Sequence, residues 1–282
     1  MSSEQLSTSM KSTISGNVVS LWRYPVKSML GEELNSSYVT ELELEGDRAY
    51  AVIDQETGKV ASAKNPRKWG TLFDFRAAFV DPIQNIDNIP RVRITLPDGT
   101  NIFSDQKDAG SILSGVLGRD VRIMSANLER PTYEEYWPNV DGLAQREKVT
   151  DELMPSQTFF DIAVIHILTT PSINRLRQLY PEGRFEVRRF RPNIVIDTEF
   201  GEKDFIENSW VGKNILIGNQ VLLKITVRCT RCVMTTLPQG DLPKDLGILR
   251  TVANFNQVTM GVYASVLRGG IIRRGDIVTL ES

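Results

Sequence analysis

The two cysteines of the chain lie three positions apart, in the segment Arg228-Cys-Thr-Arg-Cys-Val-Met. Arg228 and Arg231 flank the pair, and Thr230 adds a hydroxyl between the thiols. Positive charge lowers the pKa of a nearby thiol, and the resulting thiolate is a good ligand for a soft or high-valent metal. Guanidinium groups beside such a thiolate also suit a cofactor that carries phosphate. The segment therefore predicts a cysteine that binds the metal of an anionic cofactor.

Three other interpretations of the cysteine pair remain open from the residues alone. A structural zinc site needs four ligands, whereas the chain has two cysteines and one histidine, so a carboxylate would have to complete it. A redox dithiol favours a first cysteine at a helix N-terminus, but the residues after Cys232 are β-branched and then broken by Pro238. The third alternative is two inert buried thiols, against which the charged neighbours argue.

A second group of cations precedes a predicted strand. Within eight residues the chain has Arg184, Arg188, Arg189 and Arg191, followed by Pro192-Asn193 and the apolar run Ile194-Val195-Ile196. On a free surface these arginines would simply be solvated. Guanidinium groups, however, form bidentate contacts with phosphate, and the amide of Asn193 can both donate to and accept from a heterocycle. Their position at the start of a strand predicts that they face a pocket.

Two turns near the N-terminus also carry cations. Tyr24-Pro25-Val26-Lys27-Ser28 places an ammonium and a hydroxyl after a strand end, and Gly46-Asp47-Arg48 places a guanidinium after a tight turn. The only histidine, His166, lies in an apolar strand, which favours a core residue over a base. The chain has no nucleophile elbow, phosphate-binding Gly-Lys loop or dinucleotide fingerprint. These motifs point away from hydrolases and the common nucleotide enzymes.

The first 125 residues predict mainly strands to position these groups. A strand from Asn17 ends at Pro25, and further strands are expected at 38–44, 49–53 and 69–80. Pro97-Asp98-Gly99 predicts a turn between the two extended arms of segment 91–103. A short helix is expected over about 107–117, because its apolar residues share one side and Gly118 ends it.

The second half predicts another β-rich lobe. Residues 127–157 show no sustained period and are expected to cross between lobes, and strands are expected at 163–168, 193–197, 214–217, 221–227, 257–267 and 275–280. One helix should begin at Thr170-Pro171 and another should span about 242–254. The fold class is therefore mainly β with a few helices (α+β). We expect a disordered tail at 1–15, an N-terminal domain at 16–126 and a C-terminal domain at 127–282.

Composition limits the classes of partner. The chain has 33 Lys and Arg against 35 Asp and Glu, with 41% hydrophobic residues, which is ordinary for a soluble globular protein. This even balance predicts no nucleic-acid partner, so an anion site has to be local. No apolar run approaches the roughly 20 residues of a membrane span, and the polar start resembles no secretory signal. Two closely spaced cysteines favour a reducing compartment, and we expect a cytoplasmic protein.

Four of these segments, taken in order, resemble the MOSC family, and in particular its two-part members, which include the mitochondrial amidoxime reducing component and bacterial relatives. Tyr-Pro-Val-Lys-Ser at 24–28 and Gly-Asp-Arg at 46–48 resemble the N-terminal β-barrel region. Arg-Phe-Arg-Pro-Asn-Ile-Val at 189–195 and Cys-Thr-Arg-Cys-Val-Met-Thr-Thr at 229–236 resemble the MOSC domain. The resemblance runs from about residue 16 to the end and implies two β-barrel lobes.

The resemblance implies a molybdenum cofactor, in which a pterin dithiolene with a terminal phosphate holds the metal and a protein thiolate adds a ligand. The second cysteine of the motif is that ligand, which corresponds to Cys232, and it is also the implied catalytic residue. The positions that correspond to cofactor contacts are Lys27, Ser28, Arg48, Thr169, Arg191, Asn193, Thr230 and Arg231. Thr169, in Ile-Leu-Thr-Thr-Pro-Ser, is the loosest match.

The implied function is a two-electron reduction of small N-hydroxylated substrates such as amidoximes and hydroxylamines. No iron–sulfur segment follows the last predicted strand, so we expect electrons from a separate protein, of the cytochrome b5-like, flavin or iron–sulfur kind. One departure is Glu207-Asn-Ser-Trp210, where relatives often have an acidic residue in place of Asn208. Two rivals remain: a molybdenum-cofactor carrier or sulfuration module without turnover, and a structural protein with buried thiols and surface arginines.

Overall fold

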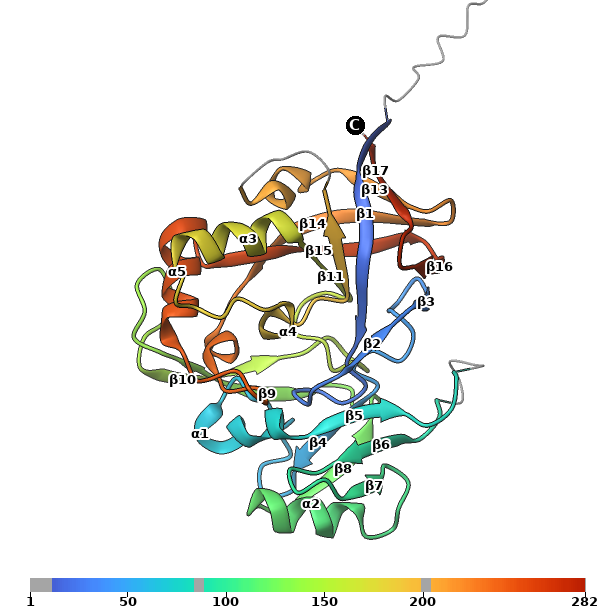
Figure 1. The fold of residues 1–282 in the computed structure, drawn as a ribbon. Coiled ribbons are helices and arrows are strands. Elements are labelled where there is room, and N and C mark those ends of the chain that lie inside the picture. Colours follow the sequence, from blue (N-terminus) through green and yellow to red (C-terminus); the bar gives the residue numbers. More distant parts are fainter. Residues whose placement is uncertain (1–11, 84–88, 199–203, 282) are drawn as a thin grey trace, which may run out of the picture.

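The computed structural model describes residues 12–83, 89–198 and 204–281, which form two β-rich lobes (Figure 1). The larger lobe is a closed barrel of seven strands. In the order of pairing these are β12 (Ile194–Asp197), β11 (Ile165–Thr169), β15 (Thr259–Arg268), β14 (Val221–Thr230), β13 (Asn214–Ile217), β17 (Ile277–Glu281) and β1 (Ser12–Arg23). The barrel closes because β1 pairs with both β17 and β12. The mainly β, α+β class expected from the sequence is confirmed.

Alternation along the barrel strands explains the core. Residues two apart point to the same face of a strand, and pairs such as Ile165 and Ile167, Ile215 and Ile217, and Leu223 and Ile225 lie fully buried in one cluster inside the barrel. All pairings between barrel neighbours are antiparallel except that of β11 with β12. The inside of the barrel is therefore a packed apolar core, so polar side chains that bind a ligand have to lie outside it, for example at the strand ends.

Strand β1 does not follow the expected domain boundaries. It begins at Ser12, so residues 12–15 of the expected tail pair with the last strand of the chain, and residues 1–11 lie outside the described part. The strand comes from the N-terminal segment yet closes the C-terminal barrel, as the long blue arrow in Figure 1 shows. The register shifts at Gly16, where an added Cβ would lie 2.0 Å from the Asp197 carbonyl oxygen. Local sequence patterns cannot reveal such a partner, because it lies far along the chain.

The smaller lobe is built from short strands around a second core. It contains β4 (Tyr50–Asp54) paired with β8 (Val121–Ser125), the sheet β5 (Arg76–Phe79), β6 (Val92–Thr95) and β7 (Asn101–Phe103), and the helix α2 (Ala109–Leu117). The expected turn between β6 and β7 and the helix ending at Gly118 are confirmed. The expected strand at 69–80 is wrong in its first half, where α1 (Pro66–Trp69) runs into the 3₁₀ helix η1 (Gly70–Asp74). Pro66 supplies a good first residue for that helix.

Short strands β2 (Glu32–Leu34) and β3 (Ser36–Val39) lie beside the barrel, where β3 pairs with β16 (Gly270–Arg273).

The segment 127–157, which was expected to be irregular, contains an antiparallel hairpin, β9 (Thr132–Trp137) and β10 (Lys148–Leu153). Its polar and aromatic residues conceal the strand period, because both faces carry polar side chains. The hairpin lies where the two lobes meet (Figure 1).

Helices cover one side of the barrel. These are α3 (Thr170–Leu179), α4 (Val187–Phe190), α5 (Leu246–Asn256), and the 3₁₀ helices η2 (Ile206–Trp210) and η3 (Val233–Thr236). The N-cap of α3 is Thr169, one residue before the expected position, and α5 starts four residues later than expected, after the N-cap Asp245. None of the helices in the described residues is long and apolar enough to cross a membrane.

Candidate functional site

A cavity of about 420 Å³ lies between the two lobes and the hairpin β9–β10. Seven of the nine site residues expected from the sequence line it: Lys27, Arg48, Arg191, Asn193, Thr230, Arg231 and Cys232. They lie up to 205 positions apart in the chain, from Lys27 to Cys232, and reach the cavity from loops at the ends of strands. The fold therefore gathers distant cations and one thiol around a single space.

The two thiols have opposite electrostatic settings. Cys232 lies between the end of β14 and η3 and lines the cavity, and burial raises the pKa of its thiol to about 11 against the opposing effect of Lys64. Burial also disfavours the thiolate of Cys229, but Arg231 and His166 outweigh it and hold the pKa of Cys229 well below its usual range. Arg231 Nη1 donates to Cys229 Sγ at 2.6 Å. The acidifying effect expected at the cysteine pair therefore acts on Cys229, which lies beneath the cavity lining.

Two guanidinium groups in the cavity wall have no carboxylate partner among the described residues. Arg191 adopts a left-handed conformation at the end of α4, donates to the Met29 carbonyl at 2.7 Å and stacks on Tyr24. Burial, with Arg48 nearby, lowers the pKa of Arg191 to about 10. Arg231 donates to the Phe190 carbonyl, and its buried Nε has no hydrogen-bond partner within the described part of the chain. This wall is therefore electropositive and suited to an anion.

Arg48 and Asn193 are connected through one buried carboxylate. Asp47 forms an ion pair with Arg48 and accepts from Asn193 Nδ2 at 2.9 Å. Asn193 Oδ1 accepts from the His166 backbone N–H at 3.0 Å. Both ends of the Asn193 amide are thus engaged by the protein, although the residue lines the cavity. His166 is buried, as expected, with its ring nitrogens 3.4 and 3.3 Å from the carbonyls of Arg191 and Met260, but it also lines the cavity.

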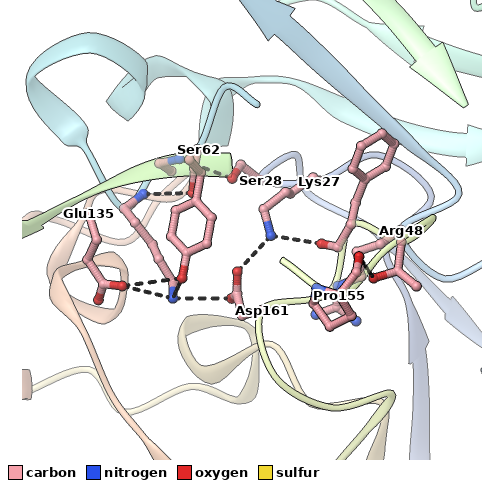
Figure 2. A network of polar contacts seen from close by, with 12 residues as sticks. Lys27, Ser28, Arg48, Ser62, Glu135, Pro155 and Asp161 are labelled. Atoms are coloured by element: carbon pink, nitrogen blue, oxygen red, sulfur yellow. Dashed lines mark hydrogen bonds and ion pairs between the residues drawn. The ribbon is translucent and has the colours of Figure 1, made fainter. Parts of the chain in front are cut away.

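A second charged network, which we call the floor network, lines the cavity and consists of Lys27, Lys64, Tyr133, Glu135 and Asp161. Figure 2 draws its polar contacts. Lys27 Nζ donates to the Phe159 carbonyl and to Asp161 Oδ1, at 2.8 and 2.7 Å. Asp161 Oδ2 lies 3.4 Å from Lys64 Nζ, and Lys64 also contacts Tyr133 Oη at 2.9 Å and Glu135 Oε2 at 3.1 Å. Burial opposes ionisation of Asp161, but the two lysines outweigh it and hold its pKa well below the usual range. The network fixes a line of alternating charges beside Cys232.

Sequence reasoning missed Lys64, Tyr133, Glu135 and Asp161. Lys64 follows no strand end, and the hairpin that carries Tyr133 and Glu135 showed no recognisable period. The one available signal was Asp161, an acidic residue four positions before the buried strand β11. Loops that lead into the strands of a sheet or barrel commonly carry functional residues, which would have justified including Asp161 among the candidate site residues.

Two expected site residues do not line the cavity. Ser28 lies next to it, with its Oγ accepting from the Ala63 backbone N–H at 3.0 Å. Thr169 is fully buried beneath α3, where its hydroxyl accepts from the Ser172 backbone N–H and donates to Glu207 Oε2 at 2.7 Å. Thr169 therefore caps the helix, and the hydrogen bonds of its hydroxyl are made to groups of the protein.

The arginine cluster that precedes β12 divides among three settings. Arg184 and Arg188 form ion pairs with Glu186 and Asp241 near the surface. Arg189 is fully buried and donates to four backbone carbonyls, those of Arg184, Thr235, Leu237 and Pro243. Arg189 and Arg191 both line the cavity without a carboxylate partner among the described residues, but the guanidinium of Arg189 is engaged by these four carbonyls, whereas that of Arg191 donates to one. The alternative that these arginines simply lie at the surface thus applies to Arg184 and Arg188.

The donor set is compatible with the pterin cofactor that the sequence resemblance implies. Arg191 and Arg231 provide positive charge without carboxylate partners, the Arg231 Nε is a buried donor awaiting an acceptor, and Cys232 supplies sulfur. In the described ranges no group of three or more His, Cys, Asp or Glu side chains is arranged to hold a metal ion.

Two family models match the chain in tandem. A MOSC N-terminal beta barrel domain matches residues 15–100, and a MOSC domain matches residues 156–279. The first model includes nearly all of β1, although this strand completes the barrel of the second domain. The hairpin β9–β10 lies between the two matched regions.

Similar proteins of known name cover most of the chain at low identity. Mitochondrial amidoxime reducing component 2 of Bos taurus is 26% identical over 293 residues, covering 93% of this chain and 82% of its own length. Mitochondrial amidoxime-reducing component 1 of Homo sapiens is 26% identical over 299 residues, covering 94% and 83%. Among solved structures, the YUAD protein from Bacillus subtilis superposes with a TM-score of 0.49 at 11% identity, covering 97% of this chain and 98% of that one.

Proposed function

Because this chain belongs to the MOSC family, as a member with an N-terminal MOSC β-barrel domain, we propose that it binds a molybdenum cofactor between its lobes and reduces N-hydroxylated compounds. Amidoximes and hydroxylamines are the proposed substrates, and a separate electron-transfer protein is the proposed source of electrons. The similarity to two mitochondrial amidoxime reducing components over more than nine-tenths of the chain supports this choice of reaction.

The observation that carries the proposal is the convergence on a single cavity of one thiol and two guanidinium groups that no carboxylate of the described residues neutralises. Cys232, Arg191 and Arg231 all line it, and neither arginine has a carboxylate partner among the described residues. Burying positive charge without full neutralisation is costly, and within the described residues Arg191 and Arg231 donate only to backbone carbonyls and the Cys229 sulfur, so an anion in the cavity would stabilise this wall. A phosphate-bearing pterin would supply such an anion.

The protein's part in the reaction is to position and to balance charge. When bound, the molybdenum cofactor supplies the two-electron redox chemistry. Arg191 and Arg231 would hold its anionic groups, and Arg48 is kept near them by Asp47. Cys232 would bind the metal as a thiolate, and because burial raises its pKa to about 11, metal binding has to displace the thiol proton. Asp161 holds the ammonium groups of Lys27 and Lys64 in place through ion pairs.

The test replaces Cys232 by Ala and compares molybdenum content and benzamidoxime reduction with a chemical electron donor. We expect the variant to lose reduction completely and to retain less molybdenum than the wild type, with Cys232→Ser behaving in the same way. Arg228→Gln is the matched control, because Arg228 is exposed on the same segment and contacts Gln257 outside the cavity. Wild-type turnover by a fully loaded Cys232→Ala protein would exclude this thiol as the ligand.

The same measurement separates the reductase from a cofactor carrier. A carrier would use the same cavity contacts, so it would also contain molybdenum and lose it when Cys232 is removed. A loaded wild-type protein that stays inactive with benzamidoxime and with an N-substituted hydroxylamine would support the carrier. A sample prepared with ample molybdate that contains neither metal nor pterin would contradict both.

A further inference from the structure

The hairpin β9–β10 presents one face to the cavity. Alternation along β9 places Tyr133, Glu135 and Trp137 on the cavity side and Glu134 on the opposite side. Glu134 accepts from Asn65 Nδ2 at 2.7 Å and pairs with Lys68. Two adjacent glutamates of one strand therefore have different surroundings, and only Glu135 lines the space that holds Cys232.

One oxygen of Glu135 is held by the protein and the other has no partner. The residue is 6% exposed, and its Oε2 accepts from Lys64 Nζ at 3.1 Å and from Tyr133 Oη at 3.5 Å. Its Oε1 receives no hydrogen bond from any described residue, although it is not among the fully enclosed unpartnered atoms. Figure 2 shows the carboxyl group at the end of the floor network, with its contacts to the network marked. The carboxyl group is thus fixed in place with one oxygen available to a ligand.

The pKa of Glu135 is shifted in the opposite direction to that of Asp161, the other carboxyl group of the floor network. The groups that face it are Lys64, Tyr133, Asp161 and Glu152, and Cys232 lies across the same cavity. Asp161 is neutralised by two lysines and stays ionised. Burial raises the pKa of Glu135, with Asp161 and Glu152 acting in the same direction and Lys64 opposing them. A carboxyl group in this setting keeps its proton to a higher pH than an exposed glutamate does.

We propose that Glu135 is the proton donor to the oxygen that leaves when the N–O bond of the substrate breaks. This role rests on the proposed reductase function. In the balanced reaction, benzamidoxime takes up two electrons and two protons, the N–O bond breaks, and benzamidine and water form. The electrons come from the electron-transfer protein through the cofactor. Glu135 supplies one proton to the departing oxygen, solvent supplies the second, and solvent then reprotonates Glu135 while Lys64 and Tyr133 keep the carboxyl group in position.

The test compares Glu135→Gln with Glu134→Gln, which changes the same residue type on the opposite face of β9. Both proteins are first assayed for molybdenum content and thermal stability. We expect fully loaded Glu135→Gln to lose about 10²- to 10⁴-fold in kcat, the usual contribution of a positioned acid, with a KM within about threefold of the wild type. The fall of kcat toward high pH, which reports loss of the donor proton, should disappear from its profile. Glu134→Gln should keep both the rate and the profile.

A second variant guards against loss of structure. Glu135→Asp keeps an acid but shortens it, so we expect a lower kcat with the high-pH fall still present. As a readout independent of turnover, benzamidine should bind to loaded Glu135→Gln and to the wild type equally, measured by tryptophan fluorescence, because Trp137 lines the cavity. A fully loaded Glu135→Gln protein with wild-type kcat and pH profile would overturn the proposal and leave the reductase function standing. A loaded wild type without reductase activity would overturn both.

Discussion

At the scale of single residues, the two cysteines show how neighbours in the sequence differ from neighbours in space. Arg231 is adjacent to Cys232 in the chain, yet its guanidinium contacts the sulfur of Cys229. The cation that most lowers the pKa of Cys232 is Lys64, which lies 168 positions earlier, and Arg231 has a smaller effect in the same direction. Coulomb interactions depend on distance through space, so the chain order alone cannot tell which of the two thiols the arginine acidifies.

Asp161 provides a prediction about acid stability. Its pKa is held below that of an unfolded aspartate by Lys27 and Lys64, so it stabilises the fold above the unfolded pKa of about 3.9 and this contribution is lost as the pH falls. Asp161→Asn also removes the ion-pair partner of buried Lys27 and one of the two carboxylates that pair with Lys64. The variant should therefore melt at a lower temperature than the wild type near neutral pH, and the difference should narrow below about pH 4. Melting curves from pH 7 to pH 2.5 measure this, and a difference that stays constant would contradict it.

At the scale of elements, several polar side chains near helices form hydrogen bonds with backbone groups that the helices and loops leave without partners. The family resemblance implies a cofactor contact for Thr169, and the position of the arginines before β12 predicts that they face a pocket. The structure uses the Thr169 hydroxyl to cap α3 and the Arg189 guanidinium to bind carbonyls around η3. A helix leaves its first backbone donors without partners, and a buried loop leaves its carbonyls without partners. Those demands compete with ligand binding for the same side chains.

Thr169 can be tested separately from the cofactor. Thr169→Ala removes the cap and one of the hydroxyl donors to buried Glu207, whose Oε1 already lacks a partner in the described residues. We expect a loss of about 1–3 kcal/mol in the free energy of unfolding, with the molybdenum content of the folded protein unchanged. Thr169→Ser keeps the hydroxyl and should retain most of the stability. Urea unfolding and metal analysis measure the two effects; loss of molybdenum at unchanged stability would favour a cofactor contact.

At the scale of the whole molecule, the two lobes are not independent. Strand β1 is followed in the chain by the smaller lobe, but it closes the barrel formed by residues 165–281. The cavity also draws on both lobes and on the hairpin between them. A barrel without β1 would expose the unpaired edges of β12 and β17, which are sites for aggregation. Cutting the chain at a domain boundary read from the sequence therefore removes a structural strand.

The barrel closure predicts the behaviour of fragments. Residues 127–282 alone should fail to show a cooperative unfolding transition, because two edges of the barrel lack their partner. Appending residues 12–24 after residue 282 through a short Gly/Ser linker should restore it, since Ser12 pairs with Glu281 and the connection is short. Circular dichroism and urea titration distinguish the two proteins. A cooperative transition of equal stability in the shorter fragment would show that β1 is dispensable for closure.

The sequence by itself determined the β-rich class, the turn between β6 and β7, the helix ending at Gly118 and seven of the residues that line the cavity. These depend on local backbone preferences and on residue types set beside strand ends, which a linear pattern records. Only the tertiary structure decided that β1 closes the distant barrel, that Arg231 faces Cys229, and that Lys64, Glu135 and Asp161 join the site. Each of these results from contacts between residues far apart in the chain, where packing and Coulomb energy act through space and leave no local period in the sequence.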